Sequence, residues 1–479
     1  MSLDRPDPLT IVIFGASGDL TRRKAMPALY NLYRENLLPD AFAIVGFART
    51  HMSDDEFRHE MKLAVMKHSR SGIADRHWYS FVQHLNYFSG GYSDAGAWAD
   101  FRKYLDSIDE RFDTEGRRLF YCATPPSAFP VIATRIGEAG LNDNARIVVE
   151  KPFGHDLESA KELNSVLHDV FGEMQIFRID HYLGKETVQN ILVFRFANGM
   201  FEPIWNRSYV ECVQIDVAES VGIEGRGSFY EEAGAIRDIV QNHMMQLVAT
   251  LGLEPPAAFE AESIRNEKVK LLKSVRPIER VNVVKGQYTA GVVGGHAVAG
   301  YQQEEDVANG SMTETYAAMK LEVDNWRWAG VPWQLRSGKR MPKRATTITV
   351  IFHKAPHMLF DASGIEAPEQ NHLTIRVQPD EGITLTFGAK VPGPDMKVAP
   401  VDMHFDYDES FMGAPAEAYE RLLLDAMLGD ATLFTRADEI ERSWEIVSSI
   451  LPKWVPEPYP AGTWGPSAAD DLVSPRGWH

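Results

Sequence analysis

A carboxylate, an imidazole, a phenol and an ammonium group fall within six residues of this chain, in the segment Asp-His-Tyr-Leu-Gly-Lys at 180–185. The apolar, β-rich residues just before it predict a short strand, and apolar residues recur at helical spacing after it. The cluster is therefore expected on a strand-to-helix turn, where the free N–H groups of a helix start favour an anion. His181, Tyr182 and Lys185 add donors for a phosphate, although a solvated turn would explain the same residues about equally well.

A candidate general base lies further along, at His243 in the helical stretch 231–251. A histidine on an apolar helix face is more often a core residue. A histidine in a half-buried cleft with a carboxylate partner, however, is the usual base near neutral pH. Asp238 lies roughly 140° round an α-helix from His243, so the two are not expected to pair directly. Asp180 is the candidate partner.

A glycine-rich turn follows the first apolar run. Residues 9–14 predict a strand buried on both faces, Gly15-Ala16-Ser17-Gly18-Asp19-Leu20 comes next, and a helical stripe begins at residue 25. This order fits a dinucleotide pyrophosphate. The match to G-x-G-x-x-G is imperfect, because the second glycine is displaced by one position and Thr21 replaces the third, so a simple tight turn remains an alternative.

Arg49, at the end of the second expected strand, indicates which dinucleotide binds. A carboxylate at this point would bind the ribose hydroxyl of NAD, whereas an arginine accommodates the 2′-phosphate of NADP. None of the residues 48–50 is acidic. We therefore expect NADP as the cofactor.

The composition excludes several classes of protein. The chain has 479 residues, of which 44% are hydrophobic and 24% charged, and its net charge of −18 argues against nucleic acid and anionic membranes as partners. It has no apolar run long enough to span a bilayer, and its N-terminus lacks the apolar stretch of a signal peptide. The only cysteines, Cys122 and Cys212, have no metal-binding spacing, so we expect a cytoplasmic protein without disulfides or a metal site.

Two architectures follow one another along the chain. Buried apolar strands alternate with helical stretches over residues 1–180, which predicts an α/β domain with a Rossmann-like, doubly wound parallel sheet that binds NADP. Residues 181–479 contain longer strands that alternate apolar and polar positions, with helices set apart. This predicts a larger α+β domain with a mostly antiparallel sheet. The tail after Pro452 is expected to wrap the surface.

Together these motifs resemble the glucose-6-phosphate dehydrogenase family. The similar segments keep their order from residue 10 to residue 450, which is far more specific than any single motif. They are GASGDLTRRK at 15–24, VEKPFG at 149–154, RIDHYLGKE at 178–186, AGAIRDIVQNH at 233–243, RSGKR at 336–340 and RVQP at 376–379.

The resemblance implies oxidation of glucose 6-phosphate at C1 to the 6-phospho-lactone, with hydride transfer to NADP. His243 would accept the C1 hydroxyl proton, and Asp180 would orient its imidazole. The implied substrate ligands are His181, Tyr182, Lys185, Glu219, Asp238, Lys339, Arg344, Lys151 and Lys24. The implied cofactor ligands are Gly15, Ala16, Ser17, Gly18, Asp19, Leu20, Arg49, Gly91, Tyr92 and again Lys151.

Two other functions stay open. The first is a dehydrogenase of another sugar, or of free glucose. It would need no phosphate site, so it would not explain why His181, Lys185 and Lys339 are all present. A catalytically inactive NADP-binding relative is expected to have lost His243 or Asp180, and both are present. The resemblance further implies that residues 181–479 bind the substrate and carry the dimer surface of a homodimer or homotetramer. It does not decide whether NAD can replace NADP, or whether a second, structural NADP site exists.

Overall fold

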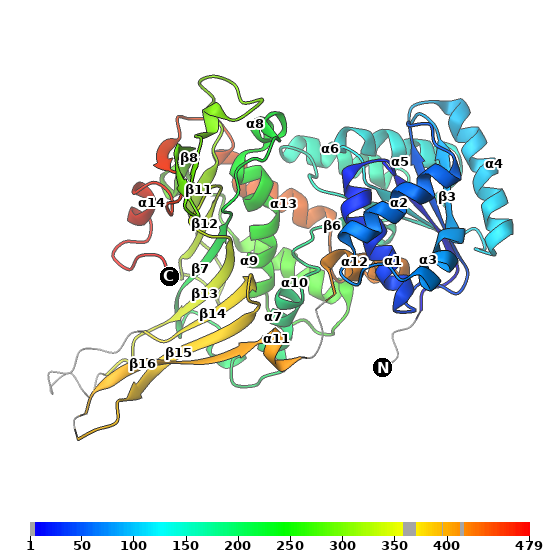
Figure 1. Cartoon of the computed structure of the whole chain (residues 1–479). Coiled ribbons are helices and arrows are strands. Elements are labelled where there is room, and N and C mark those ends of the chain that lie inside the picture. Colours follow the sequence, from blue (N-terminus) through cyan, green and yellow to red (C-terminus); the bar gives the residue numbers. More distant parts are fainter. Residues whose placement is uncertain (1–4, 358–369, 395, 412–415) are drawn as a thin grey trace. The chain divides into compact units, whose positions relative to one another are not determined.

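The computed structural model describes residues 5–357, 370–394, 396–411 and 416–479 (Figure 1). The chain divides into two compact units. The first comprises residues 1–185, 256–266 and 416–441, and the second comprises residues 186–255, 267–415 and 442–479. The division passes through helices α10 (Ala261–Ser274) and α13 (Ala437–Val447), so each of these helices contributes to both units.

A seven-stranded sheet forms the centre of the first unit, in the order β17-β6-β5-β4-β1-β2-β3. Strands β1 to β6 are parallel to one another, and β17, at one edge, is antiparallel to β6. This order of the parallel strands is that of dinucleotide-binding sheets and confirms the predicted doubly wound fold. The strands are β1 (Leu9–Phe14), β2 (Phe42–Ala48), β3 (Leu85–Ser89), β4 (Arg118–Cys122), β5 (Ala145–Val149), β6 (Ile176–Ile179) and β17 (Phe434–Thr435).

Helices cover this sheet because its central strands are apolar throughout; all six residues of β1 are buried. Helix α1 packs against α2, α3 and α12, while α5 packs against α6. Aromatic side chains fill the core between sheet and helices, with the ring centroids of Phe47 and Phe101 4.6 Å apart. The helices are α1 (Met26–Arg34), α2 (Asp54–His68), α3 (Asp75–Phe81), α4 (Ala95–Phe112), α5 (Phe129–Glu138), α6 (Leu157–His168) and α12 (Ala418–Leu428).

A nine-stranded sheet organises the second unit, in the order β16-β15-β14-β13-β7-β12-β11-β8-β18. Its pairs are antiparallel except β12 with β7 and β18 with β8, which confirms the predicted mostly antiparallel sheet. The strands are β7 (Val210–Ala218), β8 (Val283–Thr289), β11 (Tyr316–Leu321), β12 (Trp333–Gly338), β13 (Ala345–Phe352), β14 (His372–Gln378), β15 (Gly382–Lys390), β16 (Val398–Asp406) and β18 (Glu457–Pro460). Strands β9 (Gly291–Val293) and β10 (His296–Val298) form a separate hairpin.

Two local features add detail that the sequence pattern does not show. The stretch 313–328 forms a strand only over β11, which ends at Leu321, because the chain turns at residues 325–330, where Trp326 is exposed. The tail after Pro452 does more than wrap the surface, since it supplies β18 as an edge strand. Its Trp464 and Trp478 rings also lie 4.8 and 4.4 Å from the guanidinium carbon of Arg336.

The helix expected over 231–251 is three consecutive segments of different geometry. These are α8 (Gly227–Ala235), a π-helical segment η6 (Ile236–Met244) and α9 (Met245–Gly252). Gly234, with φ 60° and ψ 179°, breaks the helical path just before η6. The unit also contains α7 (Glu186–Phe196), α11 (Tyr407–Ser410) and α14 (Ala468–Asp471). None of the helices in the described ranges combines the length and apolar character needed to cross a membrane.

Candidate active site

The glycine-rich turn forms a tight backbone loop at the end of β1. Gly15 has φ +81°, and a Cβ atom there would lie 2.3 Å from the carbonyl oxygen of Ala123, so only glycine fits. The Gly15 carbonyl accepts hydrogen bonds from the Gly18 N–H at 2.8 Å and from the Thr21 hydroxyl at 3.0 Å. Thr21, which stands where the fingerprint has its third glycine, therefore closes the turn with its side chain.

Tyr92 supports the same turn from the loop after β3. Its hydroxyl accepts a hydrogen bond from the Gly15 N–H at 2.9 Å, and burial raises the pKa of this phenol. Gly91, by contrast, is not crowded, because a Cβ there would meet only Asp94 Cβ at 3.6 Å. Tyr92 thus positions the expected cofactor turn through this hydrogen bond, a contact that the sequence alone does not reveal.

The turn has the features that a dinucleotide requires. The hydroxyl oxygen of Thr124 is buried with no hydrogen-bond partner among the described residues, and its methyl group would lie 3.2 Å from a Cβ on Gly15. Arg49 is exposed directly after β2, and the adjacent Thr50 hydroxyl lies 3.2 Å from that of Ser17. The open backbone turn, the unpaired hydroxyl and the exposed arginine fit the pyrophosphate and 2′-phosphate of NADP.

The other fingerprint residues differ in their surroundings. Ala16 is fully buried, whereas Asp19 is exposed and pairs with Arg23 at 3.4 Å. Leu20 is half-buried at the entrance to the π-helical turn at 21–25. Lys24, an expected phosphate ligand, donates a hydrogen bond to Glu417 at 3.1 Å.

The acid–imidazole–phenol–ammonium cluster lies on the turn between β6 and α7, as predicted. Asp180 is 3% exposed, and its Oδ1 accepts a hydrogen bond from the Tyr182 N–H at 3.0 Å. The rings of His181 and Tyr182 lie 5.1 Å apart, and Lys185 Nζ lies 5.7 Å from the Tyr182 ring. One short turn therefore brings together the expected partner of the base and three expected phosphate donors.

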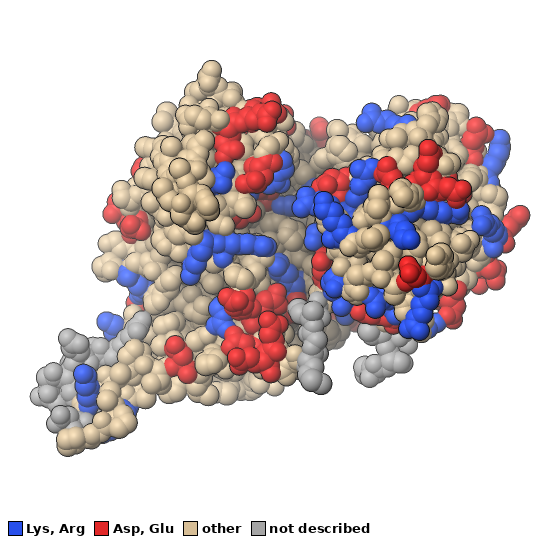
Figure 2. All heavy atoms as spheres, in the orientation of Figure 1, with Lys and Arg blue, Asp and Glu red and all other residues tan. Residues whose placement is uncertain are grey.

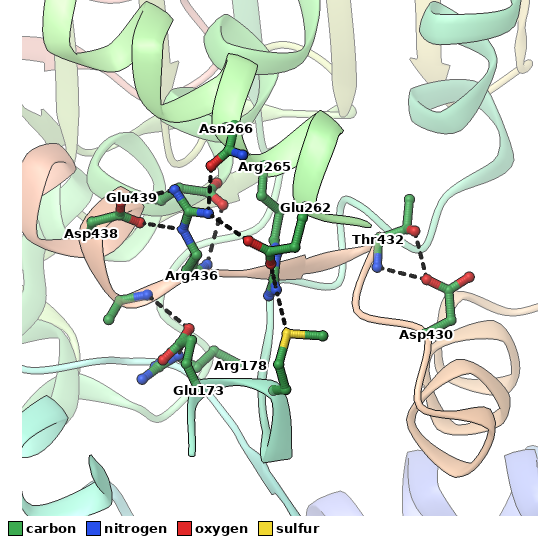
Figure 3. A network of polar contacts seen from close by, with 12 residues as sticks. Glu173, Arg178, Glu262, Arg265, Asn266, Asp430, Thr432, Arg436, Asp438 and Glu439 are labelled. Atoms are coloured by element: carbon green, nitrogen blue, oxygen red, sulfur yellow. Dashed lines mark hydrogen bonds and ion pairs between the residues drawn. The ribbon is translucent and has the colours of Figure 1, made fainter. Parts of the chain in front are cut away.

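A polar network fixes the strand that delivers this turn (Figure 3). Arg178, on β6, is fully buried and donates to Glu173 at 2.8 Å. Glu173 also accepts a hydrogen bond from the Ala437 N–H at 3.2 Å, at the start of α13. Arg436 pairs there with Asp438 at 2.8 Å. Removing one member of a buried ion pair costs about 3–5 kcal/mol, so these contacts hold β6 firmly in place.

Lys151 lies at the end of β5, which pairs with β6, and its peptide bond to Pro152 is cis. Because β5 and β6 are parallel neighbours, their carboxyl ends lie at the same edge of the sheet, where ligands bind in such folds. Lys151 is half-buried. The first unit thus gathers at this edge the residues expected to reach both sugar and coenzyme.

The second unit carries the candidate base on the π-helical segment η6. His243 is 1% exposed, and Asp238 lies five positions earlier on the same segment. In a π-helix hydrogen bonds link residues five apart, so these two occupy successive turns of one face. The separation of about 140° expected from an α-helix does not apply here, because the helix is locally wider.

Lys339 gathers the expected sugar ligands of this unit. Its ammonium group forms an ion pair with Glu219 and lies 3.7 Å from Asp238. The ammonium also lies 5.4 Å from the ring of Tyr230, whose buried hydroxyl has no hydrogen-bond partner among the described residues. Sequence reasoning missed Tyr230, which a Phe-Tyr pair in an otherwise ordinary helix does not distinguish. Fixed carboxylates beside an ammonium are suited to sugar hydroxyls.

Arg344 does not join this cluster. It is exposed and donates a hydrogen bond to the side-chain oxygen of Gln378 at 3.0 Å. On the face of the first unit that Figure 2 shows, basic side chains lie interspersed with acidic ones. Arg344 and Lys24 thus each donate to a neighbouring side chain, Gln378 and Glu417 respectively.

Comparison with known proteins gives a consistent assignment. The family model described as "Glucose-6-phosphate dehydrogenase, NAD binding domain" matches residues 12–190, and the one described as "Glucose-6-phosphate dehydrogenase, C-terminal domain" matches residues 192–479. The chain is 47% identical to glucose-6-phosphate 1-dehydrogenase of Chlamydia muridarum, over 98% of this chain and 96% of the relative. It is 46% identical to glucose-6-phosphate 1-dehydrogenase 2 of Mycobacterium bovis, over 98% and 94%.

Solved structures agree. A glucose-6-phosphate dehydrogenase in complex with its substrate glucose 6-phosphate is similar with a TM-score of 0.91 and 35% identity, covering 100% of this chain and 99% of that one. Glucose-6-phosphate 1-dehydrogenase from Mycobacterium avium is similar with a TM-score of 0.84 and 36% identity, with 99% of each chain covered. The chain belongs to the glucose-6-phosphate dehydrogenase family.

Proposed function

We propose that this protein oxidises D-glucose 6-phosphate at C1 to 6-phospho-D-glucono-1,5-lactone with NADP as hydride acceptor, the first oxidative step of the pentose phosphate pathway. The observation that carries the proposal is the match over the whole chain to a glucose-6-phosphate dehydrogenase solved with its substrate. The two half-sites described above contain every type of group that the reaction needs. Residues 1–180 would hold the coenzyme, and residues 181–479 would hold most of the sugar.

His243 is the proposed base. Its imidazole accepts the C1 hydroxyl proton, and Asp180 orients the ring and stabilises the imidazolium that forms. NADP, when bound, supplies the nicotinamide ring that accepts the hydride from C1. The burial of His243 and Asp180, at 1% and 3% exposure, keeps water away from this proton transfer.

The phosphate and the sugar hydroxyls are assigned to separate groups. His181, Tyr182 and Lys185 hold the 6-phosphate on the turn after β6. Glu219 and Asp238, both next to Lys339, accept hydrogen bonds from the sugar hydroxyls. Binding energy from the remote phosphate aligns C1 for reaction, because reacting groups held in place react far faster than free ones.

The coenzyme binds at the carboxyl edge of the first sheet. The turn at 15–20 accepts the pyrophosphate, Arg49 the 2′-phosphate, and Lys151 contacts both ligands. Lys24 adds positive charge near the 6-phosphate, and Lys339 and Arg344 contribute to that phosphate from the second unit. Gly91 and Tyr92 line the coenzyme turn. Tyr92 supports this part through its bond to Gly15.

Assembly and location complete the proposal. The strand β16 is exposed along most of its length, with Met403 62% exposed. This supports a homodimer or homotetramer, which sedimentation velocity would test. Cys122 and Cys212 are both free thiols, which supports a cytoplasmic location.

The direct test is absorbance at the NADPH band with purified protein, NADP and glucose 6-phosphate. Wild type is expected to reduce NADP quickly and to ignore free glucose, while His243→Asn loses turnover and still binds NADP. His84→Asn is the control, because that half-buried imidazole stacks on Phe42. Turnover that survives in His243→Asn would exclude this base. NADP binding without any reduction would point to the inactive relative.

A further inference from the structure

Glu150 places a carboxyl group inside the sheet edge that forms the site. It follows β5 directly and is 7% exposed. Strand β5 pairs with β4 on one side and β6 on the other. Glu150 therefore lies between the ends of the strand that carries Tyr121 and the strand that leads to Asp180. It immediately precedes Lys151.

Two phenols hold this carboxyl group. The fully buried Tyr121 donates a hydrogen bond to Glu150 Oε1 at 2.8 Å. Tyr419, from the first turn of α12, donates a second hydrogen bond to the same carboxyl. Burying a carboxyl group without hydrogen-bond partners is costly. Two donors from different elements, β4 and α12, offset that cost and fix the orientation of the Glu150 side chain. Both of these donors are neutral phenols.

The carboxyl group of Glu150 changes its protonation state near neutral pH. Burial raises its pKa to about 7, while the two tyrosines and Lys151 lower it and Asp180 raises it. Protonation therefore changes over the same range in which a histidine titrates. The charged or titratable groups that face this carboxyl from the surrounding elements are Tyr121 and Cys122 of β4, Lys151 after β5, Asp180 after β6 and Tyr419 of α12.

We propose that Glu150, held by Tyr121 and Tyr419, is a positioning residue for the reaction whose charge state controls the electrostatic environment of Asp180 and Lys151. This rests on the proposed roles of those two residues. When Glu150 is ionised, its negative charge adds to that of Asp180 and stabilises the protonated form of the base. When Glu150 is neutral, Asp180 acts alone. Through the hydroxyl of Tyr419, helix α12 therefore influences the charge of Glu150, which in turn acts on Asp180.

The proposal predicts the effect of Glu150→Gln, which retains the shape and removes the charge. With one negative charge fewer behind Asp180, the acid limb of the kcat/KM profile moves to lower pH. The ratio of kcat/KM at pH 7 to that at pH 9 rises about twofold, whereas the two profiles converge below pH 6, where wild-type Glu150 is already neutral. Tyr419→Phe removes a hydrogen bond that favours the ionised form, so it moves the profile in the same direction by a smaller amount.

Glu420→Gln is the matched control. Glu420 follows Tyr419 on α12 and is buried, as Glu150 is, but it pairs with Arg70 at 2.7 Å and accepts a hydrogen bond from Asn31 at 2.7 Å. Its loss is expected to lower the thermal midpoint and to leave the pH profile unchanged. A profile of Glu150→Gln that coincides with wild type, or an equal movement in Glu420→Gln, would overturn the proposal.

Infrared spectroscopy tests the carboxyl without relying on turnover. Wild type should show the carbonyl band of a buried protonated carboxyl at pH 6 that fades as the pH rises through 7, and Glu150→Gln should lack it. Absence of that band in wild type overturns the proposal even if both variants fail to fold. A wild type that shows the band but never reduces NADP would refute the proposed reaction instead, so the two failures are distinguishable.

Discussion

The carboxylate of Glu314 accepts a hydrogen bond from the backbone N–H of Ile236 across 3.3 Å, at the first residue of the π-helical segment that carries Asp238 and His243. Glu314 is 4% exposed and lies 3.8 Å from the ammonium group of Lys285. A carboxylate at a helix start satisfies a free N–H and opposes the helix dipole. The candidate base is therefore anchored by a residue more than seventy positions away in sequence.

Gly234→Ala should disrupt this anchor. A Cβ at Gly234 would lie 2.6 Å from Glu314 Oε1, and the φ of +60° with ψ of 179° is a conformation that only glycine adopts readily. We expect a loss of about 3 kcal/mol in the free energy of unfolding together with a lower kcat. Gly225→Ala is the control. Its φ is +72° but nothing lies within 4 Å, so about 1 kcal/mol is expected. Thermal unfolding and steady-state kinetics would measure both; equal losses would contradict the anchor.

Glu173→Gln should weaken the network behind Asp180 in a pH-dependent way. Burial raises the pKa of Glu173, but Arg178 and the hydrogen-bond donors outweigh burial and lower it overall. Its contribution to stability is therefore complete above the unfolded pKa and is lost as the pH falls through the lower folded pKa. The variant should lose about 3 kcal/mol at pH 7, and the difference from wild type should shrink below pH 4.

Chemical unfolding at several pH values measures this, with Glu138→Gln as the control. Glu138 is exposed on α5 and pairs only with Arg135 at 2.6 Å, so its loss should cost no more than about 0.5 kcal/mol. A Glu173→Gln defect that keeps its pH 7 size as the pH falls well below 4 would show that the charge of Glu173 contributes nothing.

Arg49→Ala should change the choice of coenzyme. If the guanidinium binds the 2′-phosphate, its loss removes a charged interaction of about 1.5–3 kcal/mol and lowers kcat/KM for NADP about 10- to 100-fold. The value for NAD should hardly change. Arg117→Ala is suitable as a control, because Arg117 lies just before β4, at the opposite edge of the same sheet. Equal losses with both coenzymes would remove Arg49 from the phosphate site.

Lys185→Gln should separate recognition of the phosphate from recognition of the sugar. We expect the KM for glucose 6-phosphate to rise about 10-fold or more, because a charged hydrogen bond to the phosphate is lost. Any slow oxidation of free glucose should stay the same. Lys161→Gln, on the exposed face of α6, controls for charge alone. An unchanged KM in Lys185→Gln would move the phosphate to other donors.

Much of the fold was predictable because the first sheet is made of continuous apolar runs such as β1, and the second of alternating ones. The family could be recognised from the sequence because each of its motifs is a short continuous segment, and the comparisons confirmed it. Strand β17 was not predictable: it is two residues long, and its partner β6 lies more than 250 positions earlier. The pattern of a π-helix likewise looks like that of an α-helix, so the shared face of Asp238 and His243 was missed.

The candidate site was predictable only where its chemistry is local. The turn at 180–185 could be located because strand, polar cluster and helix follow one another directly. Glu150 and Glu314 could not be found in this way, because each becomes distinctive only when burial and partners such as Tyr419 or Lys285 come from distant segments. The roles of His243, Asp180 and their proposed ligands remain predictions that the variants above would test.

The first unit is assembled from segments that lie far apart in the sequence, and this affects how it folds during synthesis. Its sheet ends at β17 and its helical layer includes α12, yet both are translated about 250 residues after β6. At ordinary elongation rates the nascent first unit must wait roughly 10–50 s on the ribosome for its last pieces. During that time the edge of β6 is exposed and can pair with other chains. We therefore expect dependence on chaperones during translation to be concentrated in this interval, and a gene truncated after residue 185 to yield an insoluble product.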